Sequence, residues 1–291
     1  MKLAWEKLQS FDRRWLFLAM GLAIALPLMF EFTMPFTTSP RVRALYDEIE
    51  TLPPGTQVLL AIDYDPASKP ELEPFARAVL RQLLLRRCRV VLMTLWDKAP
   101  PIVMALIEDI IEGEHDRHRG LFEGRDDPPL RYGVDYVFFG FKEGKEIVIA
   151  GLGQSFRQIY PADYRERPVG QLPIMNGINR LSDFPLIVEV SAGFPGTKEW
   201  VQQVVTRYGL RYAAATTSVS VTELSPYYPR QMFSLVGGMR GAAEYEKLVG
   251  QVGLATRGLN VLTVGHVVIV LAITMGNVIY FKTRKRKRGA R

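Results

Sequence analysis

The chain has 291 residues, 48% of them apolar and one of them cysteine, so it is long enough for one α/β domain with extra segments and it holds no internal disulfide. Seven of its basic groups lie in residues 282–291, whereas residues 37–281 carry 26 basic and 27 acidic groups. The isoelectric point of 9.5 therefore reflects the tail and does not indicate nucleic-acid binding.

The N-terminus predicts a membrane anchor. In residues 1–14, Ala4, Leu8 and Phe11 fall at helical spacing, which is typical of a short cytoplasmic helix at the membrane interface or, alternatively, of a frayed end. Sixteen uncharged residues follow, WLFLAMGLAIALPLMF, and apolar residues continue to position 36. We predict a transmembrane helix over 15–36. No small residues mark a cleavage site, so it is interpreted as an uncleaved signal anchor.

A connecting helix is expected over residues 37–51. Ser39 stands directly before Pro40, a pattern that starts helices, and the segment Pro53-Pro54-Gly55 ends the helix. The globular domain is placed at 52–250.

The first half of this domain alternates strands and helices. The predicted strands are 56–64 and 88–96, and the predicted helices are 70–87 and 100–113. Because both strands are continuously apolar, they predict a parallel sheet with helices on both faces. Cys88, at the start of the second strand, is expected to be buried and structural.

The second half starts after a polar loop over 114–129. His115 and His118 in this loop lack further metal ligands, so we interpret them as solvated. Two strands, 134–141 and 146–153, are predicted to form a hairpin around Gly144. The remaining expected segments are an irregular stretch over 160–184, strands at 185–193, 211–220 and 232–238, and helices at 197–209 and 240–250.

Together these segments predict a three-layer α/β domain with a mostly parallel, Rossmann-like or flavodoxin-like sheet. A second transmembrane helix is predicted over 259–281, where 23 residues carry no charge. Basic residues flank both spans on their outer sides, towards the chain ends. The positive-inside rule therefore places both termini in the cytoplasm and residues 52–250 on the extracytoplasmic or periplasmic side of the inner or plasma membrane.

The second span carries polar groups that suit contact with another helix. His266 lies in its outer half with Thr263 nearby, and Asn277 lies towards its inner end. Such groups generally face protein, although a histidine near the headgroups is the simpler alternative. The expected partners are membrane lipids and, through 259–281, another membrane protein or a second copy of the chain.

Polar residues follow the apolar strands at the edge of the sheet where ligands usually bind. The binding candidates are Ser191, Gly193 and Thr197, with His266 in the membrane helix. The catalytic candidates are Asp63, Asp65 and Thr94.

These catalytic candidates resemble the haloacid dehalogenase-type phosphatases. The resemblance implies that Asp63 attacks phosphorus, Asp65 acts as acid or base and Thr94 holds a phosphate oxygen. That family also needs later carboxylates for Mg²⁺, and the corresponding segment VEVSAGFPG contains no aspartate. The alternative interpretation is that Asp65 or Ser68 caps the following turn and that Asp63 accepts hydrogen bonds from neighbouring amides.

No motif identifies a cofactor. The sequence contains three histidines, none beside an obvious nucleophile, so it gives little support for a Ser-His-Asp hydrolase. We therefore expect a two-span membrane protein whose extracytoplasmic domain is a binding or assembly module, a subunit of a larger membrane complex rather than an enzyme. The alternative is a membrane-tethered hydrolase that uses the cleft around Asp63, Asp65 and Thr94.

Overall fold

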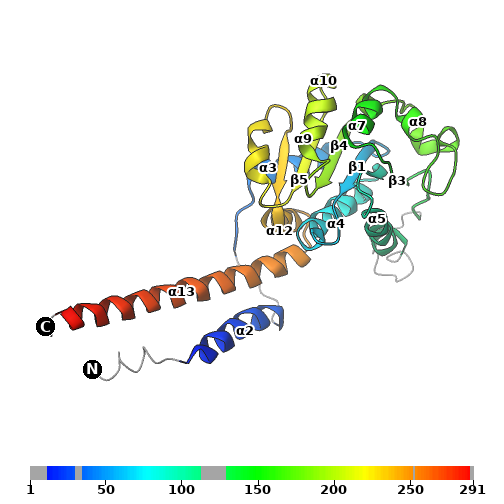
Figure 1. Ribbon diagram of the computed structural model, residues 1–291. Coiled ribbons are helices and arrows are strands. Elements are labelled where there is room, and N and C mark those ends of the chain that lie inside the picture. The colour runs from blue at the N-terminus through cyan, green and yellow to red at the C-terminus, as the bar shows by residue number, and fades with distance from the viewer. Residues whose placement is uncertain (1–11, 30–34, 113–128, 252, 289–291) are drawn as a thin grey trace. The chain divides into compact units, whose positions relative to one another are not determined.

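The computed structural model describes residues 12–29, 35–112, 129–251 and 253–288 (Figure 1). The chain separates into two compact units. One unit combines Met1–Pro35 with Thr256–Arg291, and the other is Phe36–Ala255. The predicted interfacial helix over 1–14 and the loop with His115 and His118 lie largely or wholly outside the described residues.

In the first unit the structure describes two helices. α2 spans Arg13–Met29 and contains Pro27, and α13 spans Leu254–Arg288. Among the described residues, Leu254–Lys282 is the one helical stretch long and apolar enough to cross a membrane, whereas α2 contains a shorter apolar stretch, Arg14–Pro27. Length and composition thus support the second predicted span, whereas the first, over 15–36, lies partly outside the described residues.

The second unit is built on a six-stranded sheet in which every pair of neighbouring strands is parallel (Figure 1). The strands are β1 (Gln57–Asp63), β2 (Arg89–Thr94), β3 (Tyr136–Phe141), β4 (Leu186–Ser191), β5 (Tyr212–Thr216) and β6 (Ser234–Gly237), in the order β3-β2-β1-β4-β5-β6. The α/β class and the parallel sheet are confirmed. Strand order reverses between β1 and β4, the place where a crevice forms in such sheets.

Helices cover both faces of the sheet. One face carries α3 (Pro40–Thr51), α4 (Lys69–Leu85), α5 (Pro100–Ile107) with its continuation η1 (Glu108–Glu112), and α12 (Gly238–Leu248). The other carries α7 (Lys145–Gln154), α8 (Phe156–Ile159), α11 (Val221–Leu224) and the continuous helix of α9 (Thr197–Trp200), η5 (Val201–Val205) and α10 (Thr206–Tyr208). The segment between α8 and β4 contains only short 3₁₀ turns, as the irregular stretch predicted.

The predicted hairpin after β3 is wrong, because residues 145–154 form α7. Its β-branched run favours a strand, but its buried residues Val148, Ile149 and Leu152 follow helical rather than alternate spacing. The chain must cross from β3 at the sheet edge to β4 beside β1, and parallel connections of this kind use helices. Gly153 lets the helix approach its neighbour, since a Cβ there would lie 2.5 Å from the Tyr208 ring.

The points where the chain enters and leaves the unit both lie on the α4 and α12 face. Lys247, at the end of α12, donates a hydrogen bond of 2.7 Å to the carbonyl of Phe36. Glu246 accepts hydrogen bonds from the amides of Gly253 and Ala255 at the start of α13.

Cys88 is buried, and burial raises its pKa to about 11, so the thiol stays protonated.

We predict that shortening a buried apolar side chain lowers the free energy of unfolding far more than shortening an exposed one. Leu60 on β1 is fully buried, and Val219 is 85% exposed. Leu60→Ala should lower the free energy of unfolding by about 2–5 kcal/mol, because it removes packed atoms and leaves a cavity. Val219→Ala should change it by less than about 0.5 kcal/mol. Urea unfolding of the full chain in mild detergent, followed by tryptophan fluorescence, measures both; equal effects would contradict the described core.

Candidate functional site

The carboxyl ends of the central strands bring the predicted polar residues to one edge of the sheet. In the strand register Asp63 on β1 pairs with Ser191 on β4, and Ser191 pairs with Thr216 on β5. Thr94 ends the neighbouring strand β2. The edge thus gathers one carboxylate and three hydroxyl groups from four adjacent strands.

Asp63 and Thr94 lie together but are closed to solvent. Asp63 Oδ1 accepts a hydrogen bond of 2.6 Å from the Leu95 amide and one of 3.2 Å from the Thr94 hydroxyl. Both side chains are completely buried. Asp63 therefore links the ends of β1 and β2, the amide-binding role that the alternative interpretation expects.

Asp65 does not join Asp63 in a catalytic pair. It is half-buried in the turn after β1, and its Oδ1 accepts a hydrogen bond of 3.1 Å from the Ser68 amide. This contact caps the turn that leads into α4. The two carboxylates of the D-x-D segment thus bind different backbone amides.

A second buried acid, Glu189, was missed by the sequence reasoning. It lies inside β4 and is completely buried. Its Oε2 accepts hydrogen bonds from the Thr197 hydroxyl at 2.6 Å and the Tyr212 hydroxyl at 3.1 Å. The available signal was a glutamate in the otherwise apolar run LIVEV, since a charged residue in a buried parallel strand needs partners.

Burial keeps these two acids from ionising freely. It raises the pKa of Asp63 to about 7. The Leu95 amide, the Thr94 hydroxyl and the nearby Trp200 indole N–H act in the opposite direction and lower this pKa. Burial and then the charge of Asp63 raise the pKa of Glu189 to about 8. Because each charge disfavours the other, the pair holds at least one proton near neutral pH.

An open cleft lies directly beside Glu189. Its volume is about 320 Å³, and it lies beyond the carboxyl ends of β4 and β5. It is lined by Ser191, Gly193, Phe194, Thr197, Lys198, Glu199, Thr216, Ser220, Glu223 and Leu224. The cleft thus brings together Ser191, Gly193 and Thr197, three of the four predicted binding residues.

The loop between β4 and α9 is held in place by short-range contacts. The Thr197 amide donates to Ser191 Oγ at 3.3 Å, and the Gly196 amide donates to the Glu199 carboxylate at 2.9 Å. From the turn after β2, the Trp96 indole donates to the carbonyl of Pro195 at 2.8 Å. These contacts fix the cleft wall against the neighbouring strands.

His266, the fourth predicted binding residue, lies in α13 and not in the α/β unit. Its Nδ1–H donates to the Leu262 carbonyl at 2.6 Å, and the Thr263 hydroxyl donates to the Leu259 carbonyl at 2.7 Å. Because both side chains bond to carbonyl groups of their own helix, neither requires a hydrogen-bond partner on another helix.

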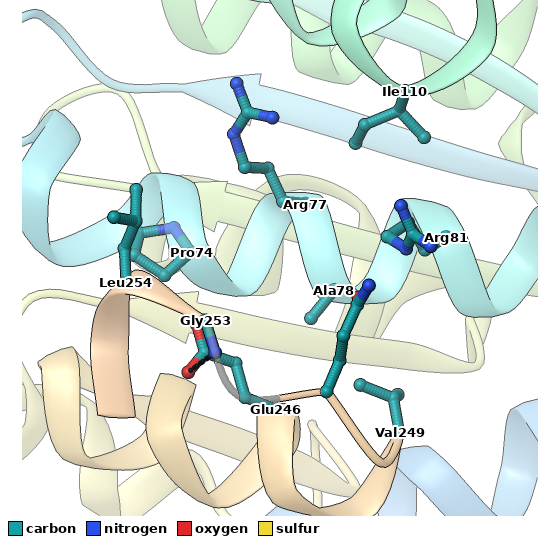
Figure 2. A pocket seen from close by; sticks show the side chains of 10 residues that line it. Pro74, Arg77, Ala78, Arg81, Ile110, Glu246, Val249, Gly253 and Leu254 are labelled. Atoms are coloured by element: carbon teal, nitrogen blue, oxygen red, sulfur yellow. Dashed lines mark hydrogen bonds between the residues drawn. The ribbon is translucent and has the colours of Figure 1, made fainter. Parts of the chain in front are cut away.

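A second cavity, of about 270 Å³, lies between α4 and the chain that leads into α13 (Figure 2). Glu246 lies beside Gly253 there, and Pro74 and Leu254 also line the cavity. Arg77 in its wall already contacts Glu73 at 2.9 Å and Asp109. In the parts of the chain that the structure describes, no group of three or more His, Cys, Asp or Glu residues is placed to hold a metal ion.

Comparisons with known proteins give only distant similarity. No protein-family model matches the sequence, and no curated protein matches it. An α,α-trehalose 6-phosphate synthase from Burkholderia multivorans is 12% identical over 94% of this chain and 48% of its own, with a TM-score of 0.33. A trehalose-6-phosphate synthase, OtsA, is also 12% identical, over 91% and 48%, with a TM-score of 0.27. This chain spans about half the length of both, and similarity this low says nothing about activity.

Because these two acids are buried, we predict that the free energy of unfolding falls as pH rises. Their ordinary pKa values are 3.8 and 4.5, and their folded values are about 7 and 8. The folded state therefore binds more protons between about pH 4 and 8, so their contribution is fully present below pH 4 and is lost towards pH 8. The free energy of unfolding should drop by at least about 2 kcal/mol between pH 5 and 8.

Replacing both acids should remove this dependence. Asp63→Asn with Glu189→Gln should flatten the pH profile measured by urea unfolding, because neither side chain then titrates. Glu143→Gln is the control, since Glu143 is exposed and should leave the wild-type slope unchanged. A steep slope in the double variant would show that other groups cause it.

The loop also predicts a strict requirement for glycine at one position. A Cβ at Gly196 would lie 2.1 Å from the Gly193 carbonyl oxygen, whereas a Cβ at Gly193 would lie 3.9 Å from the Trp96 ring. Gly196→Ala should cost about 1–3 kcal/mol in unfolding free energy because the loop must move. Gly193→Ala should cost less than about 0.5 kcal/mol. If the two variants unfolded alike, the described loop geometry would be wrong.

Proposed function

We propose that the α/β unit is a binding module whose ligand occupies the cleft beyond β4 and β5, in a protein held at a membrane. The observation that carries this proposal is one open cavity at the carboxyl ends of parallel strands, with Ser191, Thr197 and Thr216, each at most 2% exposed, in its lining. Binding sites in open α/β sheets occur at this edge.

The lining favours a small ligand that donates hydrogen bonds. The Thr197 hydroxyl donates to Glu189 and its oxygen lies 3.2 Å from Ser191 Oγ, so the acceptors that a ligand meets at the cleft surface are mainly carboxylates. Of the charged groups in the lining, Lys198 and Glu223 form an exposed ion pair at 2.8 Å, and Glu199 contributes a further negative charge. Phe194, 54% exposed, adds an aromatic surface. A polyol or an amine fits this chemistry better than an anion.

The same geometry favours binding over the alternative hydrolase. Asp63 and Thr94 have no exposed surface, and Asp65 is engaged in a turn, so a substrate cannot reach this trio in the described conformation. The hydroxyl groups that line the open cleft lie next to the carboxyl group of Glu189, but the lining contains no histidine to act as their general base.

The membrane part of the proposal rests on the sequence. The apolar stretch Leu254–Lys282 and the first predicted span over 15–36 would anchor the unit, with both termini cytoplasmic and the cleft extracytoplasmic. A Cβ added at Gly265 or Gly276 would meet no other described atom within 4 Å, so another helix has room to approach there. A partner membrane protein or a second copy through 259–281 would make the protein a subunit of a larger complex.

A ligand screen tests the cleft. Saturation-transfer NMR on the full chain in detergent, with a set of small sugars, polyols and amines, should reveal binders. Ser220→Trp should abolish their signals, because Ser220 lines the cleft, whereas Val219→Trp should preserve them, because Val219 is exposed and does not line it. Binders that survive Ser220→Trp would place the ligand elsewhere.

Reporter fusions test the orientation. A phosphatase reporter, active only outside the cytoplasm, should be inactive when fused after Arg291 and active when inserted at Glu166, an exposed residue of the α/β unit. The reverse pattern would overturn the predicted topology.

A further inference from the structure

A chain of hydrogen bonds runs from the cleft wall into the core. Ser191 Oγ lies 3.2 Å from Thr197 Oγ1, and the Thr197 hydroxyl donates to Glu189 Oε2 at 2.6 Å. Ser191 and Thr197 line the cleft, while Glu189 is buried behind them. A change of charge at Glu189 therefore acts directly on the two residues that shape the cleft.

The two buried acids are incompletely satisfied. Among the described residues, Asp63 Oδ2 and Glu189 Oε1 have no hydrogen-bond partner, and neither has the indole nitrogen of Trp200. Each acid thus has one oxygen fixed by hydrogen bonds and one without a partner at hydrogen-bond distance, although the Trp200 indole near Asp63 and the Ser191 hydroxyl near Glu189 act to lower the pKa of these acids. A bare buried oxygen accommodates a proton without breaking any existing contact, but it leaves a negative charge poorly compensated.

The surroundings offer the pair little positive charge. Tyr160 follows α8 and Tyr212 lies on β5, and for both tyrosines burial and then the neighbouring acid raise the pKa, so they remain neutral. Lys142 lies 5.9 Å from the centre of the Tyr160 ring, and Lys198 and Glu199 of α9 line the cleft. Within the part of the chain that the structure describes, no lysine or arginine forms an ion pair with either acid.

We propose that Asp63 and Glu189 form a proton switch for the cleft, in which ionisation of the second of the two acids loosens the loop between β4 and α9. This inference rests on the proposed binding function and adds its regulation. With one proton bound, Glu189 Oε2 keeps the Thr197 hydroxyl in place. With both acids ionised, two like charges share a dry site, and the strain is relieved if Glu189 turns towards water at the cleft and displaces Thr197.

Hydrogen exchange of the ligand-free full chain in detergent tests the switch. Backbone amides of residues 192–200 should lose at least about tenfold in protection between pH 6 and pH 9, after correction for intrinsic exchange, because ionisation of a buried acid is strongly disfavoured in the closed state. Protection of β1 should fall only as far as the global free energy of unfolding falls over this range, because its amides exchange through global unfolding. Glu189→Gln, whose side-chain oxygen still accepts from Thr197, should keep the loop protected at pH 9.

Asp65→Asn is the matched control, because it neutralises a nearby carboxylate that is not part of the pair and should behave as wild type. Equal protection of the wild-type loop at both pH values would overturn the proposal, as would a loss that Glu189→Gln also shows. Recovery of protection at pH 9 on adding Mg²⁺ or Ca²⁺ would overturn it in favour of a cation site. Because this experiment uses no ligand, a negative ligand screen would not change its result. A negative hydrogen-exchange result would likewise leave the ligand screen unaffected.

Discussion

The fold around the cleft depends on one interaction, the hydrogen bond from the Thr197 hydroxyl to the buried carboxyl of Glu189. A carboxyl group inside a parallel strand is costly unless neighbours donate to it, and the donors here come from α9 and β5. The contact therefore joins β4, β5 and the start of α9. In the loop between β4 and α9, Gly196 has no space for a side chain, because a Cβ there would lie 2.1 Å from the Gly193 carbonyl oxygen.

The sheet could be predicted from local pattern because buried parallel strands are continuous apolar runs, as in VLLAI and LIVEV. The segment KEIVIAGLG shows the limit of this reasoning. Its β-branched residues favour a strand, but the step from β3 at the sheet edge to β4 beside β1 requires a crossover, and that requirement is visible only once the strand order is known. Tertiary topology, and not local propensity, determined the helix.

The site was predictable to the same extent. Ser191, Gly193 and Thr197 could be proposed because the carboxyl ends of parallel strands meet at one edge, and the structure places all three around one cleft. The D-x-D segment suggested a pair because residues two apart in a strand share a face, but β1 ends at Asp63 and the chain turns there, so alternation no longer sets the direction of Asp65. Glu189, a single acidic letter in an apolar strand, gave no indication that its partner would be Asp63 from another strand.

These features together explain why the two buried acids cost stability at this edge of the sheet. Neutral, well-packed side chains at positions 63 and 189 would stabilise the sheet more than two acids that must keep a proton. The acids retain one bare oxygen each, although Leu95, Thr94, Thr197 and Tyr212 satisfy the other. Residues in such poorly satisfied positions are expected where a protein needs a group that changes charge near neutral pH. The open cleft, one hydroxyl away from Glu189, is where that change would be felt.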